Sequence, residues 1–329
     1  MSEFSSEMVS VIIPTRNRPQ LASIAVKSAL AQTLELIEVI VVIDGPDRAT
    51  VNELAQIVDL RLRTIELPTN IGASGARNAG IKAAQGTWIA FLDDDDRWLP
   101  PKLERQLEVA HQSSYSRPIV SSRFFAHTAK GEFIWPRRLP APSESMGDYL
   151  FVRNSLFLGE TFVVTPTILA RKELLEQIPF DLDLRRHEDW DWLIRVSVLE
   201  GVGLEFVPEP MAIVNLVTSQ NRQSLSNINN WQYSLDWIRS VRHLVTPTAY
   251  SACVTTVVSS QAAIDRDWQA FIPLLLDIFK FGKPRPIDLF LYVFMWLIPQ
   301  DLRQKLRSLS AKKSTGAAQN LDRSTSAKT

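Results

Sequence analysis

Four consecutive aspartates, residues 93–96, are the part of this chain best suited to chemistry. They directly follow the apolar run 88–92. Adjacent carboxylates repel one another unless a cation neutralises them or water solvates them. Mg²⁺ and Mn²⁺ prefer carboxylate oxygens and commonly share their coordination shell with substrate phosphates. We therefore expect a divalent-cation site here. The alternative is a solvated turn whose first aspartate caps a helix that begins near Pro100.

A second segment, residues 70–80, combines glycine, alanine and serine with the cation of Arg77. Small residues let a backbone approach a ligand closely. A helix N-terminus offers free amides to an anion, and arginine adds a bidentate donor. The segment matches neither a P-loop nor a dinucleotide-binding fingerprint, so it indicates anion binding only together with the aspartates.

A third acidic group, Glu188, Asp189 and Asp191, begins a segment with helical apolar spacing over 187–199. A carboxylate here could serve as a general base. The alternative is that these acids only favour a helix N-terminus. Asp189 and Asp191 are two residues apart and should not share a helical face. We expect the neighbouring His187 to be an exposed imidazole rather than a ligand.

Alternating strands and helices must position these groups. Apolar, β-branched runs predict strands, and helical spacing predicts the helices between them. The predicted strands are 9–13, 37–43, 63–67 and 88–92, and the predicted helices are 19–33, 51–58 and 75–84. Such alternation predicts a doubly wound α/β sheet, in which ligands bind beyond the carboxyl ends of the strands. Residues 15–17, Asp44 and the four aspartates follow such ends, so they should meet.

The second half predicts a further α/β portion and then a helical region. Its expected elements are a helix from Pro100 to about His111, a strand at 119–126, an irregular loop at 135–145, a strand at 162–169, a helix at 171–177, and closing strands at 202–207 and 211–217. We expect a catalytic domain over 1–220, a helical C-terminal region over 221–310, and a disordered tail over 311–329.

Composition narrows the possible partners and compartment. Lys plus Arg equals Asp plus Glu at 36 each, so no overall field draws the protein to nucleic acid. One cysteine, Cys253, excludes an internal disulfide and is expected to be a buried, inert thiol. No secretory signal is visible near the N-terminus, and we expect a cytoplasmic protein.

The apolar run 287–298 is followed by Arg303, Lys305 and Arg307. The run is shorter than the roughly 20 residues that span a bilayer. Two interpretations are open. One is a peripheral membrane contact through 287–307 on the cytoplasmic face. The other is an ordinary core helix.

Five segments together resemble glycosyltransferase family 2, which has the GT-A fold. They are 9–17, 41–45, 70–80, 91–96 and 187–195, in an order and spacing that fit the family. The resemblance implies a GT-A type doubly wound mixed sheet flanked by helices, with the C-terminal helical region as an appendage. It also implies an inverting glycosyltransferase that transfers a sugar from a nucleotide-diphosphate donor to a hydroxyl acceptor by metal-assisted direct displacement. A UDP-sugar is the first expectation for the donor, and a glycan or lipid-linked acceptor in cell-surface polysaccharide, glycolipid or glycan synthesis is the expectation for the acceptor.

The resemblance implies roles on the donor side. Those roles would be a nucleobase pocket lined by Pro14, Thr15 and Arg16, and a hydrogen bond from the base accepted by Asp44. Arg77 would approach the base or the diphosphate.

The resemblance also implies roles for the acids. Asp93 and Asp95 would form the Asp-x-Asp signature, with Asp93 near the ribose and Asp95 on Mg²⁺ or Mn²⁺. Asp93 is a second candidate for the ion, and Asp94 is a further donor-binding candidate. Because Asp94 is itself acidic, it remains open which of residues 93–96 holds the ion. Asp189 would be the catalytic base.

The sequence departs from the family in one place and leaves other functions open. Many relatives carry a basic residue after the last core strand, a role that Arg222 could fill here. Two alternatives are a non-catalytic nucleotide-binding protein on this fold and a nucleotidyltransferase.

Four aromatic residues could stack on an acceptor or simply pack in the core. They are Trp135, Tyr149, Phe151 and Phe157.

Overall fold

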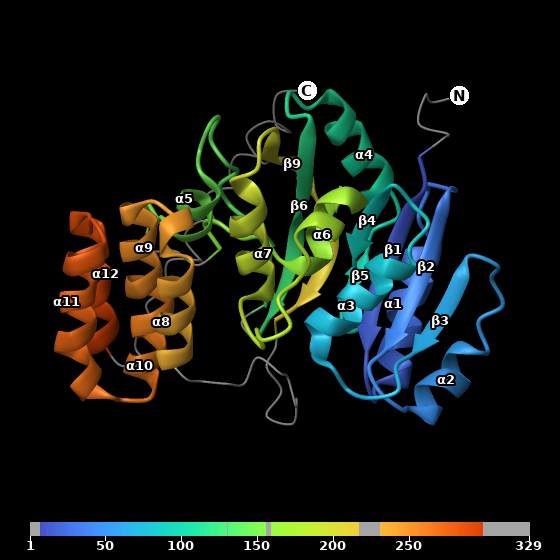
Figure 1. Cartoon of the computed structure of the whole chain (residues 1–329), viewed down its shortest axis with the longest axis horizontal. Helices are drawn as coiled ribbons and strands as arrows, with labels where there is room; N and C mark the ends of the chain where they lie inside the picture. Colours follow the sequence, from blue (N-terminus) through green and yellow to red (C-terminus); the bar gives the residue numbers. More distant parts are fainter. Residues whose placement is uncertain (1–6, 130, 156–158, 217–230, 299–329) are drawn as a thin grey trace, which may run out of the picture. The chain divides into compact units, whose positions relative to one another are not determined.

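The computed structural model describes residues 7–129, 131–155, 159–216 and 231–298, and the chain divides into two compact units (Figure 1). The first unit comprises Met1–Phe151, Gly159–Asn229 and Ser240–Thr246, and the second comprises Val152–Leu158, Asn230–Arg239 and Pro247–Thr329. The domain boundary expected near residue 220, Arg222, Phe157 and the tail expected over 311–329 lie outside the described residues.

The first unit is built on a mixed sheet. Its strands lie in the order β3-β2-β1-β4-β8-β6-β9-β5, with β7 paired to β6. Their bounds are β1 Val9–Thr15, β2 Ile37–Ile43, β3 Leu62–Glu66, β4 Trp88–Phe91, β5 Arg97–Trp98, β6 Arg117–Thr128, β7 Gly131–Trp135, β8 Leu169–Arg171 and β9 Val202–Asn215. Strands β3, β2, β1 and β4 are parallel, whereas β8 runs antiparallel to β4 and β6. This is the mixed α/β sheet that the sequence predicts.

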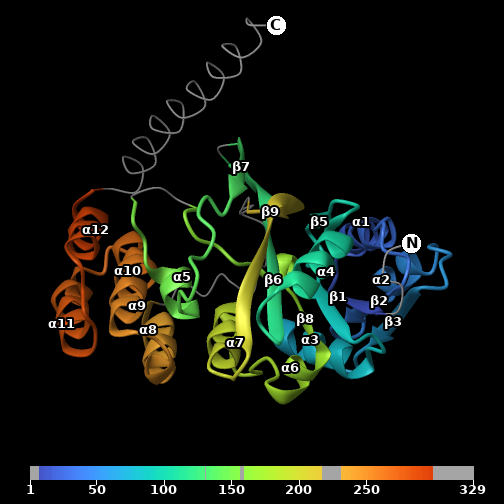
Figure 2. The ribbon, with the colours of Figure 1, turned by 90° about the horizontal axis from the view of Figure 1, so that it is seen from above.

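Helices cover both faces of this sheet (Figure 2). Their bounds are α1 Pro19–Leu30, α2 Arg48–Leu54, α3 Gly72–Ala83, α4 Lys102–Gln112, α5 Met146–Phe151, α6 Lys172–Gln177 and α7 Glu188–Ser197. One face of β1 presents Val11 and Ile13 to the core that α1 and α4 share. The opposite face presents Ile12 to α3, so closely that a Cβ atom on Gly80 would lie 2.6 Å from it. Gly80 therefore allows α3 to approach the sheet.

The structure corrects several expected elements. The strand expected at 162–169 is wrong: Thr165–Thr167 forms a 3-10 turn, and only Leu169–Arg171 is a strand. Pro166 lacks the N–H that a strand ladder needs and suits the first turn of a helix. The two closing strands expected at 202–207 and 211–217 form one strand, β9. Its prolines, Pro208 and Pro210, lie where the register of the pairing with β6 shifts, so they do not end the strand.

Two helices begin earlier than the apolar spacing indicates. Helix α2 begins at Arg48 rather than at residue 51, because the side chain of Asp47 accepts a hydrogen bond from Thr50 N at 3.1 Å and caps it. It also ends at Leu54, short of residue 58. Helix α3 begins at Gly72 rather than at residue 75.

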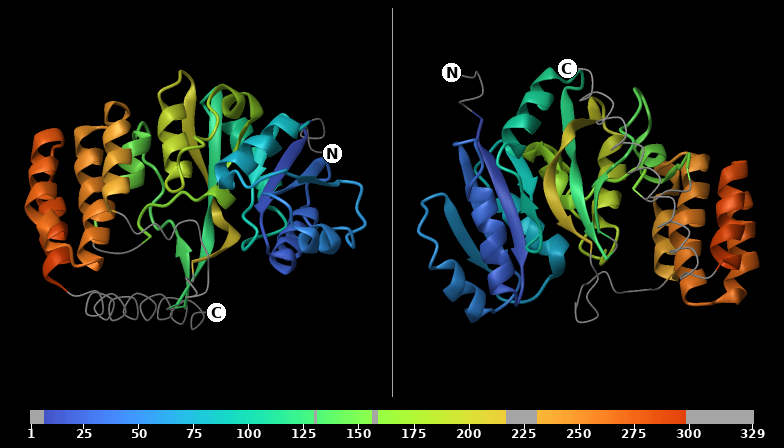
Figure 3. Two further views of the ribbon diagram at one scale, coloured as in Figure 1. Left: turned by 60° about the horizontal axis from the view of Figure 1, so that its bottom comes forward. Right: turned by 180° about the vertical axis from the view of Figure 1, so that it is seen from behind.

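The second unit is helical among its described residues (Figure 3). Its main helices are α8 Trp231–Ser240, α9 Pro247–Cys253, α10 Ser259–Ile264, α11 Phe271–Phe281 and α12 Pro286–Leu297, and a π-helical turn, Val254–Val258, joins α9 to α10. Cys253 is buried, as expected. Within the described ranges, no helix has both the length and the apolar character needed to cross a bilayer.

Candidate functional site

The polar groups that follow β1, β2 and β4 meet at one edge of the sheet. Strand β1 lies between β2 and β4 and runs parallel to both, so the three carboxyl ends are neighbours. A direct contact links two of them, because Thr15 Oγ1 donates to Asp94 Oδ2 at 2.8 Å. The prediction that these residues meet is therefore confirmed.

The four aspartates alternate between buried and partly exposed positions. Asp94 and Asp96 are buried, whereas the side chains of Asp93 and Asp95 remain 31% and 19% exposed. Besides Thr15, Asp94 contacts Arg18, whose Nη1 donates to its Oδ1 at 2.9 Å.

Burial changes the proton affinity of Asp94 and Asp96, the two buried aspartates. It raises the pKa of Asp94 to about 6, against the lowering effect of the Arg18 charge. Asp96 accepts a hydrogen bond from Asn215 N at 2.8 Å, at the end of β9. Burial, followed by the charges of Asp93 and Asp95, raises the pKa of Asp96 well above its ordinary value. Asp94 and Asp96 thus hold the loop in place, whereas Asp93 and Asp95 stay partly exposed beside the cations of Arg77 and Arg18.

Helix capping does not explain the aspartates. The N-cap of α4 is Pro101, and no side chain donates or accepts a hydrogen bond there. The solvated-cap alternative is therefore wrong for this loop. Asp93 pairs with Arg77 instead.

Arg77 of α3 connects the aspartate loop to the start of α7. Its buried guanidinium donates from Nη2 to Asp93 Oδ1 at 2.8 Å and from Nη1 to Glu188 Oε1 at 3.3 Å. The guanidinium carbon also lies 5.7 Å from the ring centroid of Phe180, whose backbone forms two hydrogen bonds with the side chain of Asn78. Burial alone would lower the pKa of Arg77, but the two carboxylates outweigh it and raise that pKa above its ordinary value. Arg77 therefore stays charged at the centre of the site.

Asp189 lies in the electrostatic field of these groups. Burial and the charge of Glu188 raise the pKa of Asp189 to about 7, and Arg77 partly opposes that rise. Asp189 Oδ1 accepts a hydrogen bond from Trp190 N at 2.8 Å. Asp191 is buried elsewhere, where its Oδ2 accepts from Arg195 Nε at 2.6 Å. As the two-residue spacing predicts, Asp189 and Asp191 have different surroundings.

His187 is not the exposed imidazole that the sequence suggests. It is buried, with a left-handed backbone (φ 67°), and its ring stacks on Trp190 at 5.3 Å between centroids. Burial and the nearby charge of Arg186 lower the pKa of His187 to about 3. The expectation of an exposed imidazole is therefore wrong: His187 is the N-cap of α7 and packs against Trp190 of that helix.

Asp44 anchors the turn that begins α3. Its carboxylate accepts hydrogen bonds from Ile71 N at 2.7 Å, Gly72 N at 3.0 Å and Asn70 Nδ2 at 2.8 Å. Gly72 has φ +84°, a conformation that favours glycine. The sequence interpretation assigned Asp44 to the base alone and missed this support of α3, the helix that carries Arg77.

Arg18 was also missed by the sequence interpretation, although it follows the predicted Thr15 and Arg16 in the same loop. Pro14 is partly buried and Arg16 is exposed.

A cavity of about 220 Å³ lies beside the buried aspartates Asp94 and Asp96. It is lined by Leu21, Ile24, Asp94, Asp95, Asp96, Arg97 and Asn215.

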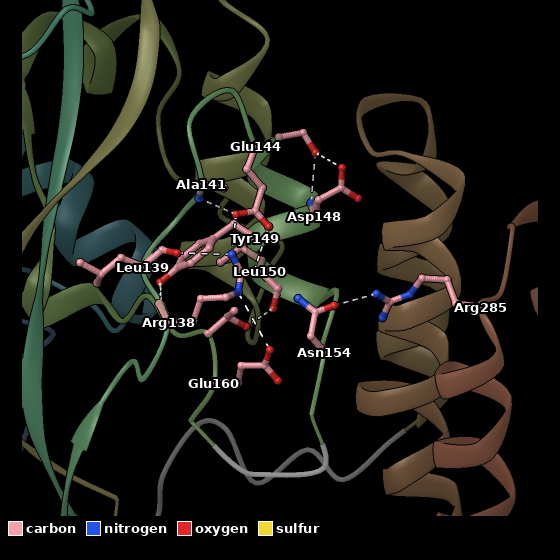
Figure 4. A network of polar contacts seen from close by, with 12 residues as sticks. Arg138, Leu139, Ala141, Glu144, Asp148, Tyr149, Leu150, Asn154, Glu160 and Arg285 are labelled. Atoms are coloured by element: carbon pink, nitrogen blue, oxygen red, sulfur yellow. Dashed lines mark hydrogen bonds and ion pairs between the residues drawn. The ribbon is translucent and has the colours of Figure 1, made fainter.

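Residues 138–149, which include Tyr149, one of the rings considered for acceptor stacking, are held by their own polar network (Figure 4). Arg138 donates two hydrogen bonds to Glu144, at 2.6 and 2.8 Å, and lies against the ring of Tyr149. The Tyr149 hydroxyl donates back to Arg138 O at 3.1 Å. Tyr149, Trp135 and Phe151 are all buried, so core packing accounts for these three aromatic rings.

The donor set for a metal is small. Across the described ranges, no group of three or more His, Cys, Asp or Glu side chains is arranged to hold an ion. Asp93 and Asp95 offer two carboxylates. Mg²⁺ is commonly bound by one or two carboxylates together with water and substrate phosphates. These residues therefore fit an ion shared with a diphosphate rather than a metal cage built by the protein alone.

Comparisons with known proteins bear on the family of this chain and on its fold. The family model described as Glycosyl transferase family 2 matches residues 10–179, just over half of the chain. The amylovoran biosynthesis glycosyltransferase AmsB of Erwinia amylovora is 28% identical over 253 residues, covering 74% of this chain and 80% of the relative. The succinoglycan biosynthesis protein ExoO of Rhizobium meliloti is 45% identical over 191 residues, covering 55% of this chain and 53% of the relative.

Solved structures show the same fold. The crystal structure of S. aureus TarS 1-349 has a TM-score of 0.59 at 16% identity and covers 88% of this chain and 81% of that chain. The same fragment in complex with UDP-GlcNAc has a TM-score of 0.53 at 18% identity, covering 88% of this chain and 79% of that chain.

Proposed function

The chain belongs to glycosyltransferase family 2, and from this premise we propose that it is an inverting glycosyltransferase that uses a nucleotide-sugar donor, in the first place a UDP-sugar. The acceptor would be a hydroxyl of a glycan or a lipid-linked sugar in polysaccharide or glycolipid synthesis. AmsB and ExoO, which are named for polysaccharide biosynthesis, support this setting. The UDP-GlcNAc complex of TarS supports a nucleotide-sugar donor.

One observation carries the proposal: Arg77 links the aspartate loop to the Glu188–Asp189 pair, although Glu188 lies 111 residues after Arg77 in the sequence. Direct displacement with inversion needs one base to accept the proton of the attacking hydroxyl. A general base works best when its pKa is near the operating pH, and the pKa of Asp189 is raised to about 7. We assign Asp189 as this base. Glu188 is held by Arg77 and Asp191 by Arg195, so both are weaker candidates.

The donor would bind at the carboxyl ends of β1, β2 and β4. Pro14, Thr15 and Arg16 would line the nucleobase pocket, and Asp44 would shape it through the 70–72 turn. Asp95 and Asp93 would hold Mg²⁺ or Mn²⁺ together with the diphosphate, while Thr15 and Arg18 keep Asp94 in the loop. When bound, the ion would supply charge neutralisation for the leaving diphosphate. A cytoplasmic location and a peripheral membrane contact through 287–307 are further parts of the proposal.

Calorimetric binding of UDP to the purified full chain tests the donor site. We expect binding in the presence of Mn²⁺ or Mg²⁺ that is lost with EDTA, and a loss of at least about tenfold in Asp95→Ala, because one of two protein ligands is removed. Asp59→Ala, which removes an acid near β3, is the matched control. Metal-independent binding of unchanged strength would contradict the metal role.

Sugar transfer tests the base. A panel of nucleotide sugars, screened for metal-dependent hydrolysis, identifies a donor for this assay. We expect Asp189→Asn to retain UDP binding and to lower the turnover rate about 10²–10⁴-fold, the usual contribution of a general base. If turnover by Asp189→Asn equals that of the wild type, another residue is the base.

A further inference from the structure

Helices α11 and α12 of the second unit expose apolar rather than polar side chains. Six large side chains are each at least 44% exposed: Ile272, Leu276 and Phe279 on α11, and Phe290, Val293 and Leu297 on α12. They recur at intervals of three and four residues, which places each set on one side of its helix. A helix that faces water normally carries polar residues on that side. Lys280 is the exposed charged residue in these two helices.

The acids of these helices point inward instead. Asp277 of α11 is buried, pairs with Arg239 of α8 and accepts the hydroxyl of Tyr250. Asp288 of α12 is also buried and pairs with Arg285 at 3.0 Å. The two acids of α11 and α12 are therefore kept away from the exposed sides of these helices.

The two exposed stripes face the same side. Helix α11 packs on α9 and α12 on α10, and both contact the π-helical turn between α9 and α10. The ring of Phe271, where α11 begins, lies 5.2 Å from Tyr292 and 5.4 Å from Trp296 of α12. Because the inner sides share one support, the outer sides form one surface, here called the α11–α12 face. The two helices that carry it are the orange-red ribbons of the second unit in Figure 3.

Cations and a tryptophan lie at the ends of this face. Lys280 and Lys283 are exposed near the turn between the helices, where Arg285 bonds to Asn154 Oδ1 at 3.1 Å (Figure 4). At the other end, Trp268 is 56% exposed beside Trp296 of α12. The sequence that follows α12 carries five cations and one acid over residues 299–313. Tryptophan at the rim and nearby cations favour a bilayer interface that contains anionic lipid.

We propose that the α11–α12 face binds the surface of an anionic bilayer, with both helices lying along it and the six apolar side chains inserted at the boundary of headgroups and acyl chains. A second copy of the chain would bury the same apolar area but would set the flanking cations of one copy against those of the other. The proposal deepens the membrane contact through 287–307 that is part of the proposed function, and it does not rest on the transferase chemistry, because none of its residues belongs to the donor or base site.

Vesicle co-sedimentation of the full chain tests the proposal. We expect binding to phosphatidylcholine vesicles that contain about one third phosphatidylglycerol, weaker binding to pure phosphatidylcholine, and a loss of binding at high salt. The double variant Leu276→Asp, Phe290→Asp should bind at least tenfold more weakly. Leu60→Asp, Leu182→Asp changes two exposed leucines of the first unit and should bind like the wild type.

A second measurement does not depend on a disruptive charge. Leu276→Cys can be labelled with an environment-sensitive fluorophore, because the native Cys253 is buried. The emission of this label should shift to shorter wavelength when anionic vesicles are added. The same label on Leu60→Cys should not shift. Equal vesicle binding by the wild type and the Asp variant, or an unchanged label at residue 276, overturns the proposal. Concentration-dependent self-association that Leu276→Asp abolishes, without vesicle binding, would instead make this face a contact between copies.

Discussion

Replacing Arg77 with methionine would remove the buried cation that lies between the two acidic groups of the site. Methionine keeps much of the side-chain volume but cannot pair with Asp93 or Glu188. The loss should exceed that of an exposed ion pair, which is worth about 0–1 kcal/mol. The loss of stability should be smaller than the roughly 3–5 kcal/mol lost when one partner of a fully buried pair is removed. The reason is that the side chains of Asp93 and Glu188 are still 31% and 22% exposed.

These limits predict a destabilisation of about 2 kcal/mol at pH 8. For a unit of this size, the melting temperature should fall by about 4–8 °C.

The destabilisation by Arg77→Met should depend on pH, and the pKa of Asp189 determines the direction of that dependence. Its pKa is about 7 in the folded protein, above the roughly 3.9 of an unfolded aspartate, so the folded state binds more protons between these values. Stability therefore falls as the pH rises from about 4 to 7. Arg77 lowers this pKa, so its removal should raise the pKa further and steepen the fall. We expect Arg77→Met to be more destabilising at pH 8 than at pH 5.

Scanning calorimetry at both pH values measures the effect. Arg77→Lys keeps the charge without the two-pronged contact and should lose less stability. Arg61→Met removes an arginine that pairs with Asp59 and is the matched control, with an expected change within about 0.5 kcal/mol. Equal losses at pH 5 and pH 8, or a methionine variant as stable as the wild type, would refute the electrostatic reasoning.

Two further predictions concern single buried groups. Asp44→Ala should lower the free energy of unfolding by about 2–4 kcal/mol, because it leaves the amides of Ile71 and Gly72 without their acceptor. Hydrogen exchange of these two amides should accelerate, and it should accelerate less in Asp44→Asn. Unchanged exchange in Asp44→Ala would contradict the prediction and show that water replaces the carboxylate. Lys102 is fully buried, and burial lowers its pKa well below the ordinary value. The folded chain therefore holds this proton less tightly than the unfolded chain, and stability should rise with pH up to about pH 10, near the pKa of an unfolded lysine. Lys102→Met should remove this rise, although it also loses the Gln106 hydrogen bond. Denaturant titrations at pH 7 and pH 9 measure the slope, and a variant whose stability rises between them as steeply as that of the wild type would contradict the reasoning.

Local pattern in the sequence was enough to determine the sheet and the edge where the site lies. The apolar runs at β1, β2 and β4 are buried on both sides, a property that each run carries in its own residues. Polar residues follow each run, and parallel strands bring their carboxyl ends together, so Thr15, Asp44 and the four aspartates had to meet.

Partners and burial were decided only by the tertiary structure. The pairing of Arg77 with Glu188 depends on how α3 and α7 pack on the sheet, which no local spacing encodes. The burial of His187 and its stacking on Trp190 also appear only in the folded chain. Likewise, α11 and α12 are apolar at almost every position, so only packing on α9 and α10 decides which apolar side chains are buried, which are exposed, and that Asp277 and Asp288 face inward. Side-chain partners are chosen by elements distant in the chain, and their identity appears only when those elements are in place.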